Sequence, residues 1–309
     1  MDGKTIGTMR RIVLSILLFV PILIEAENLF EAGLHGGAGS WAAQTDYIRP
    51  QMGFQGGAHL YYNYLSESVF GFRLGVTVDH HALGWRKTDY QDTYSTIDVE
   101  GQQMDIAYSI GNLQEQYAIW SVGVPVQVAL SYKGIMLFAG GKVAFHLANT
   151  WKQTVQDAAL SVYYPDYDNR VYESYPLAAS QDFAMCQEGQ LQLPKVQWWL
   201  VTELSYRILL DKWARNYRSY IIVGAYFDYC LSRYTPTHSD AESLVMLSDT
   251  RAGFPLQRML TPVMESNRQG DALVDHCSLF DVGVKISYAL APYKAHRRAS
   301  HSCNCLGVW

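Results

Sequence analysis

The amino-acid sequence predicts an all-β fold, namely an eight-stranded antiparallel up-and-down transmembrane β-barrel with short periplasmic turns and long extracellular loops. Three observations predict it. Apolar and polar residues alternate with a period of two through eight long segments of the chain. The connections between these segments are alternately short and long, and aromatic residues gather near the ends of the apolar faces.

The first four predicted strands cover residues 30–41, 51–65, 69–85 and 117–132. The alternation is clearest in 69–85, VFGFRLGVTVDHHALGW. One parity holds Phe70, Phe72, Leu74, Val76 and Val78, and the other holds Arg73, Thr77, Asp79 and His81. This segment is about three times as long as the usual strand of a soluble protein, which favours a membrane barrel.

The other four predicted strands cover residues 135–147, 196–211, 219–232 and 277–290. Each sets an apolar face against a face of glycines and polar residues, such as Trp198 and Leu200 against Glu203 and Arg207. Eight is an even number, as closed bacterial membrane barrels require.

The connections indicate which end of the barrel faces the cell exterior. The short ones are residues 66–68, 133–134 and 212–218, and the long ones are 42–50, 86–116, 148–195 and 233–276. In bacterial outer-membrane barrels the short turns are periplasmic. We therefore assign residues 27–290 to the barrel and the four long connections to extracellular loops.

A soluble two-sheet sandwich or a lipocalin-like barrel would show the same alternation, because its apolar face would line a core. Strand length, the asymmetry of the connections and aromatic girdles at both interfaces favour the membrane barrel. The girdles consist of Tyr62, Tyr64, Phe70, Phe72, Tyr132 and Tyr288 near the periplasmic ends and Trp120 and Trp198 near the outer ends.

Both ends of the chain are expected to lie outside the barrel. Met9-Arg10-Arg11, the apolar run 12–24 and Ala26 have the pattern of a secretory signal peptide, so we predict that residues 1–26 are removed on export to the bacterial outer membrane. Residues 291–309 form a basic tail on the periplasmic side.

Composition excludes two classes of protein. The 309 residues carry a net charge of −5, which gives no basic bias toward nucleic acid, so no nucleic-acid partner is expected. After the N-terminus no segment reaches 18 unbroken apolar residues, which excludes a helical membrane protein.

The polar parity of the strands predicts a charged barrel interior. Its members are Glu31, His35, His59, Arg73, Asp79, His81, Gln127, Lys142, His146, Glu203, Arg207, Asp228, Asp281 and Lys285. An eight-stranded barrel is filled by its own side chains, and buried charges must be paired. We therefore interpret this set as a structural network of ion pairs, with a proton or ion pathway, or a narrow pore, as the alternative.

A membrane-embedded lipid hydrolase or acyltransferase is a second alternative, because such an enzyme needs a nucleophile, a histidine and an acid near the outer leaflet. His80 and Ser40 have outward parity near the outer ends of their strands, but no outward acid completes the set. His238-Ser239-Asp240 are consecutive residues in a predicted loop, which do not point at one another by default. We expect no enzymatic activity and no catalytic residues.

The sequence contains five cysteines. Cys186, Cys230, Cys277, Cys303 and Cys305 are odd in number, so at least one stays unpaired, and the pairing of the rest is open. Neither a cofactor nor a metal is expected. The loop 148–195 is aromatic and acidic, which suits either partner binding or packing into an ordered cap.

The final predicted strand contains GVKISYAL (283–290), and the fourth contains a proline-bearing SVGVPVQVALSY (121–132). Together with the strand series, these segments resemble the eight-stranded outer-membrane β-barrel family typified by the OmpA transmembrane domain and by the PorT-like barrels linked to type IX secretion. The resemblance implies a non-enzymatic accessory or structural subunit of an outer-membrane assembly, secretion or uptake complex, or a stand-alone surface protein. Its implied partners are outer-membrane lipids and other outer-membrane or periplasmic proteins.

Overall fold

The structure, a computed structural model, describes residues 26–66, 69–97, 101–165, 185–211, 217–234, 243–247, 258–268 and 270–292. Within these ranges the chain is almost entirely antiparallel β-structure, with one short 3-10 helix, η3 (Val263–Glu265). No helix among these residues has the length and apolar character needed to span a membrane. The predicted all-β, antiparallel, up-and-down fold is confirmed. The predicted signal peptide up to residue 25 and the tail from residue 293 lie outside the described residues.

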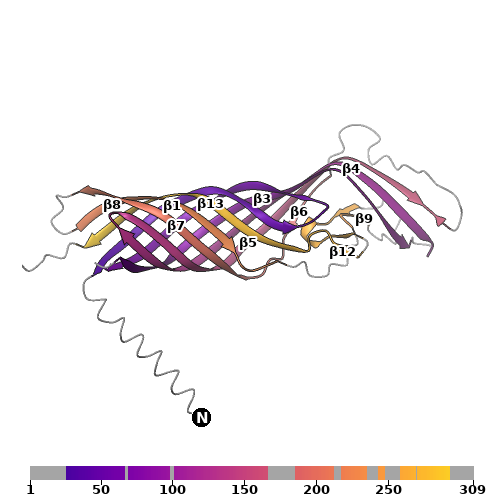
Figure 1. The fold of residues 1–309 in the computed structure, drawn as a ribbon. Helices are drawn as coiled ribbons and strands as arrows, with labels where there is room; N and C mark the ends of the chain where they lie inside the picture. Colours follow the sequence, from indigo (N-terminus) through magenta and orange to yellow (C-terminus); the bar gives the residue numbers. More distant parts are fainter. Residues whose placement is uncertain are drawn as a thin grey trace, which may run out of the picture.

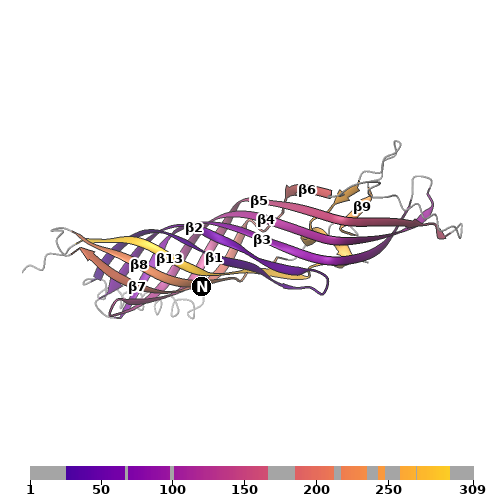
Figure 2. The ribbon, with the colours of Figure 1, turned by 90° about the horizontal axis from the view of Figure 1, so that it is seen from above.

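Eight long strands pair side by side in one sheet (Figures 1 and 2). They are β1 (Ala26–Gln44), β2 (Arg49–Ser66), β3 (Phe70–Ile97), β4 (Gln103–Tyr132), β5 (Ile135–Tyr163), β7 (Val196–Asp211), β8 (Tyr217–Cys230) and β13 (His276–Pro292). Their order is β4-β3-β2-β1-β13-β8-β7-β5, and β5 also pairs with β4. The order therefore returns to its first strand, and we call these eight strands the ring.

The remaining strands are short. β6 (Met185–Gln190) adds to the edge of β5, β9 (Val245–Leu247) pairs with β10 (Arg258–Leu260), and β11 (Asn267–Arg268) pairs with β12 (Asp271–Ala272). We call the end of the ring near residues 66–70, 132–135 and 211–217 the turn end, and the opposite end the far end.

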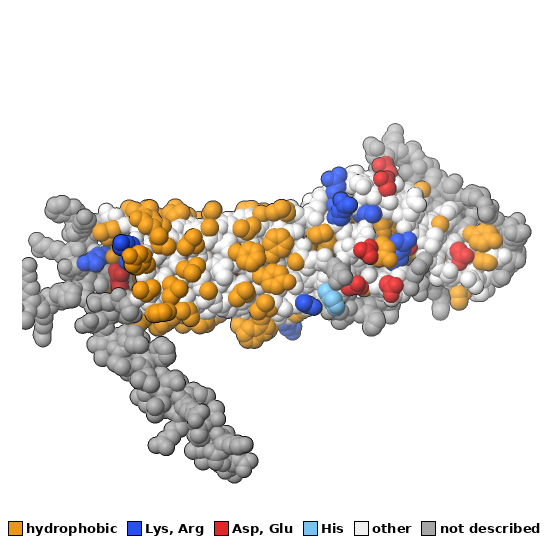
Figure 3. Space-filling view, viewed as in Figure 1, with side chains coloured by type: hydrophobic (Ala, Val, Ile, Leu, Met, Phe, Trp, Pro, Cys, Tyr) orange, Lys and Arg blue, Asp and Glu red, His pale blue; other side chains and the backbone are white. Residues whose placement is uncertain are grey.

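The outside of the ring is apolar over most of its length (Figure 3). One parity of every ring strand places large apolar side chains on the surface, and these form what we call the apolar belt. Its most prominent members are Phe30, Leu34, Phe54, Leu60, Phe70, Leu74, Val126, Val128, Ile135, Leu137, Leu147, Trp198, Leu204, Val223, Phe227, Val284 and Ile286.

The inside of the ring has three layers. At the turn end an apolar layer fills the interior, and it consists of Leu29, Leu65, Ala129, Met136, Phe138, Tyr220, Ile222, Ala289 and Ala291. The middle layer holds the buried charged residues described below. At the far end lies a larger apolar layer rich in aromatic side chains, among them Trp41, Trp85, Tyr117, Trp151 and Trp199. The charges are thus enclosed between two apolar layers.

Three strands continue well beyond the ring, as Figure 1 shows. β3, β4 and β5 are 28, 30 and 29 residues long, whereas the pairing of β2 with β3 stops at Arg49 and Arg86. Beyond that pair, β3 to β6 form what we call the projecting sheet. The sequence analysis assigned residues 86–116 and 148–195 to loops. This assignment is wrong for 86–97, 103–116, 148–163 and 185–190, which are strand. Residues 42–44 and 49–50 of the predicted loop 42–50 are also strand, and β9 to β12 lie within the predicted loop 233–276.

The physical reason for this error lies in the outward parity of the projecting sheet. On β3 the outward positions Gln91, Thr93 and Ser95 are exposed and polar, while the inward Tyr90 and Tyr94 are buried. An alternation without apolar outward residues gives a weak strand signal. The inward face packs against the chain between β8 and β13, through Leu244, Val263, Met264, Leu273 and Val274. We call this covering segment the cap.

Glycines set how closely the ring strands approach. Gly37 lies opposite Gly283 on β13, and a Cβ added to Gly37 would come within 2.1 Å of the Val282 carbonyl oxygen. At the neighbouring Gly36, which has the opposite parity, an added Cβ would be 3.7 Å from its nearest atom, the Gln55 carbonyl oxygen.

We therefore predict that alanine substitutions at these two adjacent glycines differ in their effect on stability. Gly37→Ala should lower the free energy of unfolding by about 1–3 kcal/mol, because the backbone cannot yield without shifting a strand. Gly36→Ala, the matched control, should be neutral or slightly stabilising. Urea unfolding in detergent, followed by tryptophan fluorescence, measures both. Equal unfolding midpoints for the two variants would contradict this account of strand spacing.

Candidate functional site

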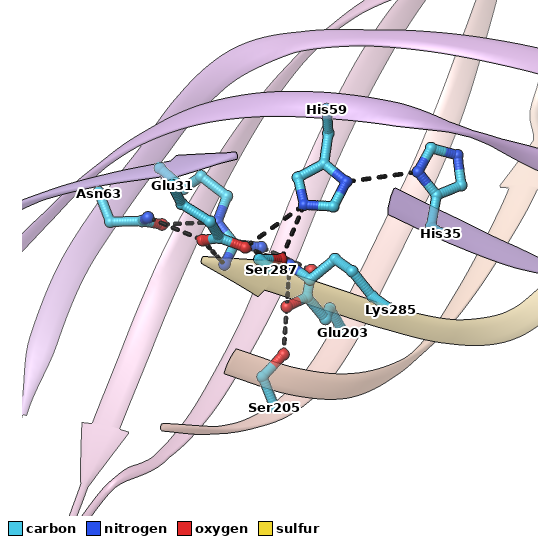
Figure 4. A network of polar contacts seen from close by, with 9 residues as sticks. Glu31, His35, His59, Asn63, Glu203, Ser205, Lys285 and Ser287 are labelled. Carbon is cyan, nitrogen blue, oxygen red and sulfur yellow. Dashed lines mark hydrogen bonds and ion pairs between the residues drawn. The ribbon is translucent and has the colours of Figure 1, made fainter. Parts of the chain in front are cut away.

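The centre of the buried charged layer is Arg73 on β3, whose side chain is fully buried. Its guanidinium contacts Glu203 of β7, with Nη1 2.6 Å from Oε2, and Glu31 of β1, with Nη2 3.1 Å from Oε2. Its Nε donates to the Asn63 side-chain oxygen at 2.6 Å. Lys285 of β13 also contacts both carboxylates, with Nζ 2.9 Å from Glu31 Oε1 (Figure 4). Four strands are therefore joined through two cations and two carboxylates.

Two histidines connect this cluster to the middle of the ring (Figure 4). His59 Nε2 lies 2.8 Å from Ser287 Oγ and 3.6 Å from Glu31 Oε1. Its Nδ1 is 3.4 Å from Nδ1 of His35, whose Nε2 lies 2.8 Å from Asp79 Oδ1. The network thus continues without a break from β13 to β3.

Toward the far end the network continues through Lys142 of β5. Its Nζ lies 3.3 Å from Asp79 Oδ2 and 3.0 Å from Asp228 Oδ2. His81 Nε2 is 2.8 Å from Asp281 Oδ2. Trp199 covers this end, because its ring stacks on His81 and lies 4.9 Å from the Lys142 ammonium.

The other sequence-predicted interior residues occupy the edges of the network. Gln127 is buried and lines a small cavity beside Asp79. Arg207 pairs with Glu27 at the turn end, with Nη1 2.7 Å from Oε2. His146 lies at the far end opposite Ser121, where the β4–β5 register shifts.

Sequence reasoning missed several members of this layer. Glu27 lies next to the predicted cleavage point and was not assigned to the interior. Asn63 has the correct parity and could have been included. The Phe138 ring lies 3.3 Å from the Arg73 guanidinium carbon, and Tyr61 lies 4.6 Å away. Phe138 could not have been found from charge, because only its parity distinguishes it from an apolar belt residue.

The charges of the network nearly balance. Its carboxylates are Glu27, Glu31, Asp79, Glu203, Asp228 and Asp281, and its permanent cations are Arg73, Lys142, Arg207 and Lys285. Two carboxylates exceed the cations, and His35 and His81 lie directly against Asp79 and Asp281. A buried charge without a partner would cost several kcal/mol, so this near balance is a condition for the fold.

The space left within the network is small. A cavity of about 30 Å³ lies between His35, Asp79, Lys142 and Glu203, which is roughly the volume that one water molecule occupies in the liquid. Apolar layers fill the ring on both sides of the network. This geometry suits a sealed, hydrogen-bonded plug and leaves no room there for an organic substrate.

A different buried acid ties the cap to the projecting sheet. Glu115 on β4 is fully buried and has no cation beside it. Its carboxylate accepts a hydrogen bond from the Val263 backbone N–H at 3.0 Å, and others from the Gln153 amide and the Tyr117 hydroxyl. Burial raises the pKa of Glu115 to about 8, and the nearby Glu265 adds to the rise, while the bonds from Val263 and Gln153 oppose it.

The residues considered for an enzyme are not brought together. The His80 ring contacts the Trp120 ring in a tilted arrangement, with centroids 4.5 Å apart. Ser40 is buried, and its Oγ lies 3.3 Å from the Gln51 carbonyl oxygen, to which it donates. Residues 238–240 lie outside the described part of the chain. Cys186, Cys230 and Cys277 are free thiols within the described residues.

These features define the chain as an all-β antiparallel protein with an apolar outside and a charged, tightly packed inside. Neither a family model nor a curated protein matches the sequence. Among solved structures, the chain is similar to the crystal structure of Ail, the attachment invasion locus protein of Yersinia pestis, in complex with the heparin analogue sucrose octasulfate. That similarity has 10% identity and a TM-score of 0.24, and it covers 87% of this chain and 100% of that one.

The position of Glu115 predicts that the cap loosens as the pH rises. The folded-state pKa of Glu115 lies above the ordinary value of about 4.3. The stability that Glu115 contributes is therefore complete below about pH 4.3 and is lost as the pH rises through about 8. The hydrogen-exchange protection factor of the Val263 amide should fall across this window.

Glu115→Gln should remove this fall, because the amide stays neutral at every pH. Glu188→Gln, which changes an exposed acid on β6, is the control and should keep the wild-type profile. A wild-type protection factor that stays constant between pH 5 and 9, after correction for intrinsic exchange, would contradict the role given to Glu115.

Proposed function

We propose that this chain is a non-enzymatic integral β-barrel protein of the bacterial outer membrane, closed into an eight-stranded transmembrane barrel. The observation that carries the proposal is the apolar belt. Its outward positions are occupied by side chains such as Leu60, Val126 and Val284, which are 59–66% exposed. Soluble monomers rarely expose contiguous apolar patches of more than a few hundred Å², whereas a lipid bilayer would cover this surface.

The distribution of charge supports the same conclusion. Along the belt, no outward position of the ring strands carries Asp, Glu, Lys or Arg, while the inward positions carry the whole ion-pair network. A basic residue on the lipid face costs about 2–4 kcal/mol at mid-membrane. This inverted arrangement is the one expected of a wall between lipid and a polar interior.

We further propose an accessory or structural role in an outer-membrane assembly, secretion or uptake complex. The projecting sheet supports this role. Its inward face is fixed to the cap by a large apolar core, and its outward face presents exposed polar side chains such as Gln91, Thr93 and Ser95. A rigid surface of this kind beyond the membrane is suited to binding another protein. The packed interior gives little support to a pore, and the separation of Ser40 and His80 gives little to a lipid-modifying enzyme.

Membrane insertion makes a specific prediction for two arginine substitutions. Val284→Arg places a cation in the middle of the belt and should destabilise the lipid-embedded protein by about 2–4 kcal/mol. Thr93→Arg, on the exposed face of the projecting sheet, should have little effect. Unfolding of the protein in lipid vesicles, read as loss of heat-modifiable gel migration, measures the difference. Equal stability of the two variants would argue against a membrane-embedded belt.

The accessory role requires a partner on the projecting sheet. Cross-linking in intact cells, followed by mild extraction and mass spectrometry, should recover a defined outer-membrane or periplasmic protein with the wild-type chain. The double variant Gln91→Arg/Thr93→Arg should lose that protein while remaining in the outer membrane, because its changes lie outside the belt. Recovery of the chain alone, or of the same partners with the variant, would count against this role.

A further inference from the structure

A groove of about 800 Å³ crosses the outer surface at the far end of the apolar belt. It runs across five neighbouring strands, from β2 through β3, β4 and β5 to β6. Small residues form its floor, namely Gly53, Ala82, Gly84, Ala118 and Gly189. The groove lies at the boundary between the belt and the polar projecting sheet.

The groove coincides with an irregularity in the pairing of β2. The register of β2 against β3 shifts between Gln51 and Phe54, as in a β-bulge. Gly53 lies in the shift, and a Cβ there would come within 1.7 Å of the Ala82 carbonyl oxygen. On the belt side the groove is bordered by Met52, whose side chain is 68% exposed. The apolar belt begins next to Met52, at the exposed Phe54.

The wall on the other side is basic. Arg49 and Arg86 lie directly opposite each other on β2 and β3, two residues beyond the groove residues Gln51 and Gly84. Both arginines are exposed, and no described residue forms an ion pair with either. Lys152 also lines the groove, although Glu188 lies opposite it on β6. Figure 3 shows basic side chains, with acidic ones among them, just beyond the end of the belt.

Two like charges directly opposite on neighbouring strands are destabilising by themselves. A bound anion between them would turn this repulsion into attraction, because arginine forks bind phosphate oxygens with two parallel hydrogen bonds. The groove joins this cationic pair to an apolar surface. A ligand that is anionic at one end and apolar at the other complements both walls.

We propose that this groove binds the phosphate-bearing headgroup of an outer-leaflet lipid with a net negative charge, with Arg49 and Arg86 on the phosphate and the acyl chains on the belt below Met52. This inference rests on the proposed function, since it needs the belt to be in a bilayer. It adds a defined site to the general contact between a barrel and its lipids. The small residues of the floor leave room for the headgroup.

The test uses the full chain in nanodiscs of zwitterionic phosphatidylcholine, with or without anionic phosphatidylglycerol. The readout is the number of phosphatidylglycerol molecules retained by the protein in native mass spectrometry, together with its thermal midpoint. Arg49→Gln/Arg86→Gln should bind phosphatidylglycerol roughly thirtyfold more weakly, from about 1 kcal/mol per basic residue near a membrane surface. Lys195→Gln/Arg233→Gln, which removes two exposed cations elsewhere at the far end, is the matched control and should retain wild-type binding.

Because Arg49 and Arg86 repel each other, their removal should change the stability of the protein in opposite directions in the two lipids. A general charge effect would not produce this reversal. In phosphatidylcholine alone, Arg49→Gln/Arg86→Gln should be as stable as the wild type or more stable, because the repulsion is gone. In phosphatidylglycerol it should be less stable. Ala118→Phe, which fills the groove without changing charge, should also weaken phosphatidylglycerol binding.

Each remaining outcome has a defined meaning. Equal loss in the control and the arginine variant would overturn the site and leave only diffuse attraction to the surface. Wild-type binding by Ala118→Phe would overturn the groove as the binding site. Stabilisation by inorganic phosphate in phosphatidylcholine to the same extent as by phosphatidylglycerol would overturn the lipid as the ligand. Failure of the wild type to enter nanodiscs at all would instead contradict the membrane proposal itself.

Discussion

The structure depends on pairing the positive charge of a fully buried guanidinium with carboxylates. Arg73 lies within the ring between Glu31 and Glu203, and Lys285 contacts the same two carboxylates. Side chains on a strand alternate between two faces, so a slip of one residue would move Arg73 to the outside and an apolar neighbour inward. Such a slip of β3 would break both ion pairs of Arg73 and put a cation on the apolar surface. The ion pairs therefore fix the register of β1, β3, β7 and β13 together.

The apolar layers on either side give these ion pairs their strength. Phe138 and its neighbours close the turn end, while Trp199 and the aromatic layer close the far end. Excluding water lowers the local dielectric, which strengthens paired charges and raises the cost of unpaired ones. Glu115 shows the second effect outside the network, because it is equally buried and has no cation. One chain thus contains a charge cluster that rigidifies the ring and a single acid that makes the cap sensitive to pH.

Much of this arrangement could be predicted from the sequence, because parity is a strong signal when one face is apolar. Each of the eight ring strands matches a predicted segment, apart from residue 69 before β3 and residues 231–232 after β8, and Arg73 and Asp79 share the inward face as their spacing indicates. The signal failed where the outward face becomes polar, so the projecting part of β3 was taken for a loop. Neither the contacts of the cap nor the partner of each charge is encoded in local alternation.

The register shift in β2 lies between the apolar belt and the polar projecting sheet. On the ring side of Gly53 the outward residues are apolar, and on the other side Gln51 and Arg49 are polar. A register shift changes which residues oppose each other without breaking the sheet, so β3 can run continuously from the belt into the projecting sheet. Because β3 holds Arg73 at one point and Arg86 at another, the same strand that is fixed by the buried ion pairs positions the exposed cationic pair. The height of the groove relative to the belt is therefore set by the interior register and not by the flexibility of a loop.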